Sequence, residues 1–339
     1  MAILIAAAMV IVHIVQSCGI PAIRPLKKPP KASPNRIVNG WEAKPHSLPW
    51  MVMILLTYGR RYVTCSGFLI ENGMQNETDI VLTATHCLHI EGIYQPPGNM
   101  FFLVGAHNVE NLTDAVQRRA RTYLTHFYKS TNDDNDIAMI RLNKPVTYGS
   151  HISPLCLPGD ETPKVENGEC FAAGWGTTER ELPVSALQDV LLPKCFRKGN
   201  EFSTKSDFFI RPVRRVLRSI RDNKQAVLRW SGDSGSPLFC EIEGRYFALG
   251  ILSHGAINCT ENVPATYTRL SAYGQWINSS LSQLRKAPYQ TEHTQGQGTI
   301  FIPKRTRLPG MLWSGGQQEF TEGSSLIALL SGYHKRRTA

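Results

Sequence analysis

The chain has 339 residues, of which 42% are apolar, a composition typical of a globular protein with a substantial buried core. A core of that size excludes a small scaffold that depends on disulfides, so the eight cysteines indicate the compartment in which the chain folds. The formal charge of +10 is concentrated in residues 196–230, where ten Lys or Arg and three Asp or Glu give a net +7, an excess that suits anionic glycans or membrane surfaces.

The first 17 residues predict a secretory signal peptide. Residues 1–17 form an apolar run that is too short to span a bilayer and ends in Val-Gln-Ser, with small residues suited to signal-peptidase cleavage. The run begins without Lys or Arg, and the alternative is a buried N-terminal helix. A signal peptide predicts a secreted, extracellular protein with paired cysteines and glycosylation at Asn-X-Ser/Thr sites. These sites are at Asn76, Asn111, Asn278 and, with a cysteine in the middle, Asn258.

The rest of the chain divides by composition. Residues 18–36 are rich in Pro and Lys and predict an exposed propeptide. From residue 37, short apolar and β-branched runs alternate with turn residues, which predicts an antiparallel barrel or sandwich, and the polar residues 148–168 divide it into two halves. Residues 271–284 predict a short amphipathic helix, and residues 285–339 predict a mostly disordered extension.

Three motifs together indicate a nucleophilic serine. His86 lies in "LTATHC" at the end of an apolar strand, Asp136 leads "DNDIAMI" into a buried strand, and Ser234 lies in Gly-Asp-Ser-Gly. Each alone has an ordinary structural explanation. A hydroxyl becomes a good nucleophile when an imidazole accepts its proton and a buried carboxylate holds that imidazole in one tautomer. The order His, Asp, Ser is one of the few in which such a triad is laid out.

On these motifs, residues 37–284 resemble the chymotrypsin-like serine proteases, an all-β family whose fold is two packed six-stranded antiparallel β-barrels with a short C-terminal helix. The resemblance assigns His86 as general base and acid, Asp136 as its orienting partner and Ser234 as the nucleophile. It places the oxyanion hole at the backbone N–H groups of Gly232 and Ser234. It implies no cofactor, and because the sequence shows no cluster of metal ligands we expect no metal site.

The segment "RIVNG", residues 36–40, resembles the activation junction of that family. Cleavage after Arg36 would free the amine of Ile37, which in the family pairs with the aspartate before the nucleophile, here Asp233. The resemblance therefore implies an endopeptidase made as a zymogen, acting through an acyl-enzyme on Ser234. Its partners would be a protein or peptide substrate, an activating protease that cuts after arginine and serine protease inhibitors, with no nucleic acid.

The resemblance also implies three disulfides, of which the last keeps the propeptide attached after cleavage. The pairs are Cys65–Cys87, Cys170–Cys240 and Cys18–Cys156. Cys195 and Cys259 lack their usual partners, because no cysteine lies between Cys195 and Ser234. They are free, paired with each other or bonded to another chain.

The residues before Gly232 depart from the family pattern, with Trp230 in place of a cysteine. In an ungapped register Leu228 forms the floor of the primary specificity pocket, Gly255 lies on its wall and Ala265 narrows its interior. A leucine floor offers no counter-ion to a basic side chain, so this register predicts a preference for apolar residues of moderate size.

Residues 213–220 carry apolar side chains at helical spacing between arginines, which predicts a basic amphipathic helix. One interpretation makes residues 197–229 a binding site for heparin-like glycans or anionic lipid. The alternatives are a divergent loop or an incorrectly predicted exon in place of the pocket segment. The altered pocket also leaves a second hypothesis for the whole chain, a catalytically impaired protease homologue that binds a partner through this basic segment.

Overall fold

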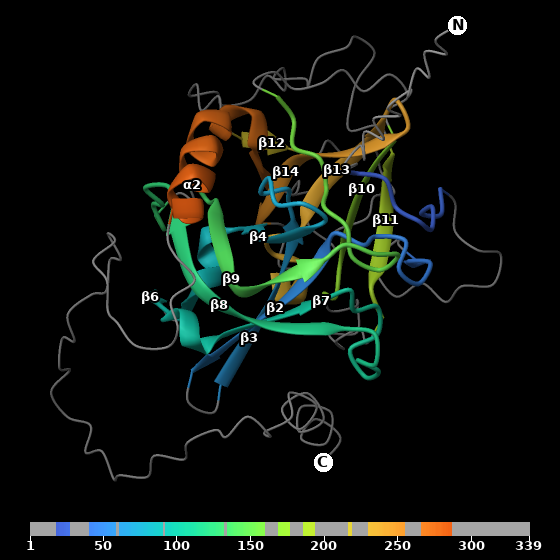
Figure 1. Cartoon of the computed structure of the whole chain (residues 1–339). Coiled ribbons are helices and arrows are strands. Elements are labelled where there is room, and N and C mark those ends of the chain that lie inside the picture. The colour runs from blue at the N-terminus through green and yellow to red at the C-terminus, as the bar shows by residue number, and fades with distance from the viewer. Residues whose placement is uncertain are drawn as a thin grey trace, which may run out of the picture.

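The computed structural model describes residues 18–27, 41–58, 61–90, 92–131, 134–159, 169–176, 186–193, 216–218, 230–254 and 266–286. A closed barrel and a seven-stranded sheet, built largely from consecutive halves of the chain, lie beside each other, and the C-terminal helix α2 packs near the barrel (Figure 1). Within the described residues, no helix combines the length and apolar character needed to cross a membrane.

The first half is a closed antiparallel barrel in the strand order β2-β3-β4-β9-β8-β7. Its strands are rich in β-branched and aromatic residues, which suit a pleated, half-buried surface, and inward side chains such as Ile54, Phe68 and Phe102 are fully buried. The bounds are β2 Met51–Tyr58, β3 Arg61–Leu69, β4 Glu77–Thr83, β7 Met100–Val104, β8 Val116–Thr125 and β9 Ala138–Thr147.

The second half is a seven-stranded antiparallel sheet in the order β1-β11-β10-β13-β14-β15-β12. The half contributes six strands of its own, as predicted, and β1 extends the edge because Trp41 pairs with Asp189 of β11. The described strands pair as an open sheet with β1 and β12 at its edges. The bounds are β1 Trp41–Glu42, β10 Glu169–Gly174, β11 Gln188–Pro193, β12 Val216–Arg218, β13 Pro237–Ile242, β14 Arg245–His254 and β15 Thr266–Arg269.

Strand β12 corrects the prediction of a basic amphipathic helix around residues 213–220. Val216–Arg218 is extended and pairs antiparallel with β15, Val216 opposite Thr268 and Arg218 opposite Thr266. The backbone pairing offered by β15 outweighs the local helical spacing of the apolar residues. The remainder of residues 197–229 lies outside the described residues.

The amphipathic C-terminal helix is confirmed, although it begins later than Ser271. A 3-10 turn, η3 Leu270–Tyr273, leads into α2 Gly274–Lys286, whose buried face includes Ile277, Leu281 and Leu284. The remaining short elements are η1 Thr85–Leu88, β5 His89–Ile90, β6 Ile93–Tyr94, η2 Pro97–Asn99 and α1 Trp230–Asp233.

Three disulfides join segments that are far apart in sequence, in the pairs that the resemblance implies. They are Cys18–Cys156, Cys65–Cys87 and Cys170–Cys240. The segment 18–27 lies against β14, because Tyr246 N donates to Gly19 O at 2.8 Å. The predicted signal peptide, residues 28–36 of the propeptide and residues 287–339 of the extension lie outside the described residues, and Arg285 and Lys286 belong to α2.

Candidate active site

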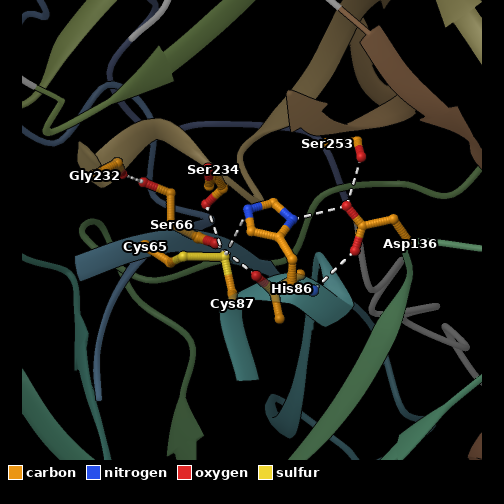
Figure 2. Close-up of a disulfide and its surroundings, with 9 residues drawn as sticks. Cys65, Ser66, His86, Cys87, Asp136, Gly232, Ser234 and Ser253 are labelled. Atoms are coloured by element: carbon orange, nitrogen blue, oxygen red, sulfur yellow. Dashed lines mark hydrogen bonds and ion pairs between the residues drawn. A yellow bond between two sulfur atoms is a disulfide. The ribbon is translucent and has the colours of Figure 1, made fainter. Parts of the chain in front are cut away.

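His86 lies in the turn η1, directly after β4, at the point where the first barrel meets the second sheet (Figure 2). The Thr85 hydroxyl fixes this turn by donating to Ile137 O at 2.7 Å. The His86 imidazole keeps 21% of its side chain exposed, whereas Asp136 beside it is fully buried. The ring is therefore open to solvent on one side and held by a carboxylate on the other.

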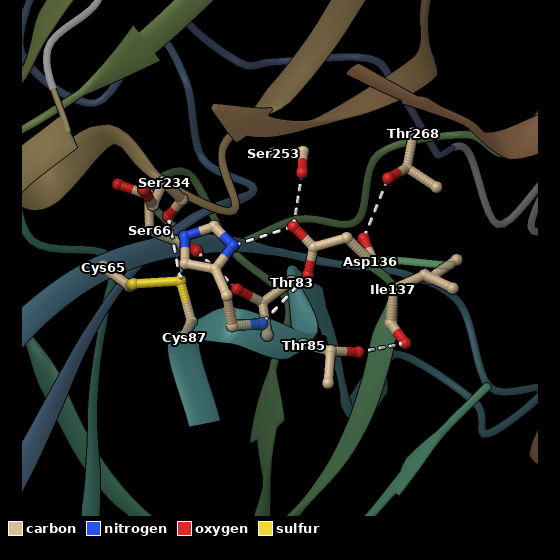
Figure 3. A network of polar contacts seen from close by, with 11 residues as sticks. Cys65, Ser66, Thr83, Thr85, Cys87, Asp136, Ile137, Ser234, Ser253 and Thr268 are labelled. Atoms are coloured by element: carbon tan, nitrogen blue, oxygen red, sulfur yellow. Dashed lines mark hydrogen bonds and ion pairs between the residues drawn. A yellow bond between two sulfur atoms is a disulfide. The ribbon is translucent and has the colours of Figure 1, made fainter. Parts of the chain in front are cut away.

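The carboxylate of Asp136 accepts hydrogen bonds at both oxygens. His86 N donates to Oδ1 at 2.9 Å and His86 Nδ1 contacts Oδ2 at 2.7 Å. The Ser253 hydroxyl, from β14, donates to the same Oδ2 at 2.5 Å, and the Thr268 hydroxyl, from β15, donates to Asp136 O at 2.9 Å. Both halves of the molecule thus hold Asp136 in place, as the network in Figure 3 shows.

The charged form of Asp136 is stabilised by these donors. Burial acts to raise the pKa of Asp136, but the charge of His86 and the hydrogen bonds from His86 and Ser253 outweigh burial and hold the pKa below its ordinary value. A carboxylate that stays ionised accepts a hydrogen bond from Nδ1–H and so keeps the proton of the neutral ring on Nδ1, which leaves Nε2 as the basic nitrogen.

Ser234 follows the short helix α1 in a turn held by Ser66 of β3. Ser66 N donates to Ser234 O at 2.8 Å, and the Ser66 hydroxyl donates to Gly232 O at 2.6 Å. Gly232 has φ +103°, where a side chain would also meet the backbone of Trp175, so glycine is required there. The first barrel therefore fixes the backbone on both sides of Asp233.

Ser234 lies on the side of the His86 ring opposite Asp136 (Figure 2). Cys87 Sγ, half of a disulfide, is 3.9 Å from His86 Nε2 and 3.5 Å from Ser234 O. The structure thus brings together the three side chains that the sequence singles out, with a basic nitrogen directed toward a serine. This arrangement can transfer a proton from the hydroxyl to the imidazole.

Asp233 is buried in a space that two glycines leave open. Its Oδ1 accepts from Gly176 N at 2.8 Å, and a Cβ at Gly174 or Gly176 would overlap its carboxylate. The end of β10 and the residues after it therefore leave room for the Asp233 carboxylate because Gly174 and Gly176 lack side chains.

Several predicted site residues lie outside the described residues. They are Arg36 and Ile37 of the activation junction, Leu228, Gly255 and Ala265 of the pocket, and Cys195 and Cys259. Of the predicted glycosylation sites, Asn76, Asn111 and Asn278 are exposed, whereas Asn258 is not described.

Sequence reasoning missed Ser66, Ser253 and Thr268, which support the three predicted side chains. Each is a small hydroxyl residue buried within a strand, and a buried hydroxyl indicates an acceptor nearby without identifying it. Their partners are 132 residues away for Thr268 and 117 for Ser253.

Comparisons with known proteins agree with this geometry. Residues 37–277 match the family model described as trypsin. The chain is 31% identical over 263 residues to the clotting factor G beta subunit of Tachypleus tridentatus, an alignment that covers 71% of this chain and 78% of that protein.

Proposed function

Because the chain belongs to the trypsin family of serine proteases, we propose that it is a secreted endopeptidase, made as a zymogen, that hydrolyses peptide bonds through an acyl-enzyme on Ser234. The observation that carries this proposal is the His86 ring, hydrogen-bonded at 2.7 Å to the buried Asp136 and facing Ser234 on its other side.

In the proposed acylation, Ser234 Oγ attacks the carbonyl carbon of the scissile peptide while His86 Nε2 takes the hydroxyl proton. The tetrahedral intermediate collapses when the imidazolium gives that proton to the leaving amine, which breaks the C–N bond and leaves an ester on Ser234. A water molecule repeats both steps, with His86 as its base, and releases the new carboxylic acid and free serine.

Asp136 and the turn before Ser234 supply the electrostatics. The ionised Asp136 stabilises the imidazolium that forms in each step, and its hydrogen bonds from the second sheet keep it oriented. The backbone N–H groups of Gly232 and Ser234 would bind the oxyanion, because Ser66 fixes the carbonyls of both residues and thereby the orientation of the turn.

Activation is proposed to follow cleavage after Arg36. The new ammonium of Ile37 would pair with Asp233, whose buried carboxylate lies beside Gly174 and Gly176. A buried carboxylate gains from such a partner, which provides the driving force for ordering the loops around it.

The proposed substrates are proteins or peptides with an apolar residue of moderate size at the cleavage site, because Leu228 offers no counter-ion. An activating protease that cuts after arginine and serine protease inhibitors are proposed partners. The sequence similarity to a clotting factor subunit supports secretion to the extracellular space.

The proposal is tested with a fluorescent fluorophosphonate, which labels an activated serine covalently. The full chain is expressed with the residues just before Ile37 replaced by the recognition sequence of an added protease. Cleavage by that protease makes Ile37 the N-terminus. The cleaved chain is then titrated beside its uncleaved form and the Ser234→Ala variant. We expect stoichiometric labelling of the cleaved chain, far slower labelling before cleavage and none in Ser234→Ala. A folded, correctly cleaved chain that takes up no label would refute the proposal.

A further inference from the structure

Three potential metal ligands from separate segments meet outside the catalytic triad. His46 lies between β1 and β2, Asp114 between β7 and β8, and His151 after β9. One ligand atom from each residue lies within 4.8 Å of the other two, and His46 Nε2 is 3.9 Å from Asp114 Oδ2. Two imidazoles and a carboxylate therefore surround one small volume.

The two histidine rings of this cluster lie face to face, with centroids 3.6 Å apart and an interplanar angle of 11°. The lone pair of an imidazole nitrogen lies in the ring plane, so one ring must turn before both rings can direct a nitrogen at the same ion. A neutral imidazole keeps the nitrogen lone pair that a metal ion needs.

The backbone at His46 is also unusual. Its φ of +59° lies in the left-handed region, which residues other than glycine seldom adopt, and such conformations concentrate at functional sites. The His46 side chain is 16% exposed and that of Asp114 is 60% exposed. The cluster thus holds one ligand with a constrained backbone and one exposed ligand, and a cation can reach it from solvent.

We propose that His46, Asp114 and His151 bind a zinc ion, with water as the fourth ligand. Two imidazoles and one carboxylate are ligands that Zn²⁺ prefers, whereas Ca²⁺ and Mg²⁺ require six or more oxygen ligands. Tetrahedral bonds of about 2.0–2.2 Å place ligand atoms about 3.3 Å apart. The cluster reaches that geometry by rotation of its partly exposed side chains.

A bound ion would link three segments that lie far apart in the sequence. His46 is ten residues beyond the proposed cleavage site at Arg36, Asp114 belongs to the first barrel, and His151 lies on the connection between the two halves. Because the three ligands converge only in the folded chain, zinc would bind the folded form and stabilise it.

The test titrates ZnCl₂ into the full chain without an affinity tag. Ser234→Ala prevents self-cleavage, and alkylation with iodoacetamide blocks free thiols. Calorimetry measures affinity and stoichiometry, the thermal midpoint reports stabilisation, and Co²⁺ in place of Zn²⁺ reports the ligands by its visible absorption. The variants are His46→Asn, whose new side chain tolerates a left-handed backbone, His151→Asn and Asp114→Asn.

A matched control is His107→Asn, because the His107 ring centroid is 6.2 Å from that of His46 and its Nε2 contacts Glu42 Oε1 instead. We expect one zinc ion per chain and, in each ligand variant, an affinity for zinc at least about 100-fold weaker than that of the parent. Removing an outer partner of a metal ligand already weakens affinity by up to about that factor, so removing a ligand itself should cost no less. His107→Asn should stay within about 10-fold of the parent.

Either of two results overturns the proposal: a folded parent chain that binds no zinc at millimolar concentration, or ligand variants that bind zinc as tightly as the parent. Asp114→Asn changes an exposed side chain, so it decides the question even if a histidine variant fails to fold.

Discussion

The Ser253 hydroxyl donates a 2.5 Å hydrogen bond to a carboxylate that solvent does not reach. Loss of a hydrogen bond to a charged buried group costs about 1.5–3 kcal/mol, compared with about 0.5–1.5 kcal/mol between neutral groups. We therefore expect Ser253→Ala to lower the free energy of unfolding at neutral pH by about 1.5–3 kcal/mol. The two remaining hydrogen bonds to the carboxylate both come from His86, so no described donor of the second sheet replaces the lost bond.

This cost should decrease in acid. The folded pKa of Asp136 lies below its ordinary value of 3.8, so its carboxylate contributes stability above that value and the contribution is lost as the pH falls through the lower folded pKa. Ser253 bonds the charged form, so Ser253→Ala raises the folded pKa of Asp136. Once the carboxyl is protonated in both proteins, the difference in unfolding free energy should fall to about 0.5–1.5 kcal/mol.

The assay is urea unfolding, followed by tryptophan fluorescence, at a series of pH values from about 7 down to about 2, so that the series extends well below the ordinary pKa of 3.8. All proteins carry Ser234→Ala to prevent self-cleavage. The control is Thr268→Val, which removes a hydroxyl that donates to the neutral backbone carbonyl of Asp136 and should cost the same at each pH. If Ser253→Ala shows the same pH-independent cost as this control, the stabilisation of a buried charge by Ser253 is refuted.

Three further predictions concern other parts of the molecule. Gly176→Ala places a Cβ against the Asp233 carboxylate, so cleavage of the zymogen should no longer produce fluorophosphonate labelling. Burial and the charge of Tyr94 raise the pKa of Tyr123 to about 12, so the neutral phenol stabilises the folded chain below pH 10, and urea unfolding should show that stability lost as the pH rises toward 12. The disulfide Cys18–Cys156 should keep the cleaved propeptide attached, giving one band on a non-reducing gel and two on a reducing gel.

Each of these has a control. Gly98→Ala adds a side chain in open space and should activate normally, and an equally active Gly176→Ala would contradict the crowding around Asp233. Tyr123→Phe should lose less stability between pH 10 and 12 than the parent, and identical curves would show that another group titrates. Release of the propeptide without a reductant would exclude the proposed tether.

Sequence motifs were sufficient to predict the pairing of His86 with Asp136 and the strand-rich fold. In these motifs a polar residue lies next to the end of an apolar strand, so the pairing of the strands determines where its side chain lies. Ser253 was not identified because its role depends on a carboxylate 117 residues away, and one serine within an apolar strand has no distinctive spacing.

The prediction for Val216–Arg218 was wrong for a different reason. Apolar residues at helical spacing describe a local preference, whereas β15 offers an unpaired edge that satisfies the backbone of an extended segment. A short stretch of sequence does not show which distant strand its backbone will pair with. The same limitation applies to β1, two residues that precede the first barrel yet join the second sheet.

The position of β1 limits how far a newly formed N-terminus can travel. Trp41, paired with Asp189, is four residues after Ile37, and four residues span at most about 14 Å. The ammonium of Ile37 would therefore stay close to a fixed point on the second sheet. Its effective concentration there would exceed the millimolar values that short flexible linkers give. Activation by this route is intramolecular, and its equilibrium should be independent of protein concentration.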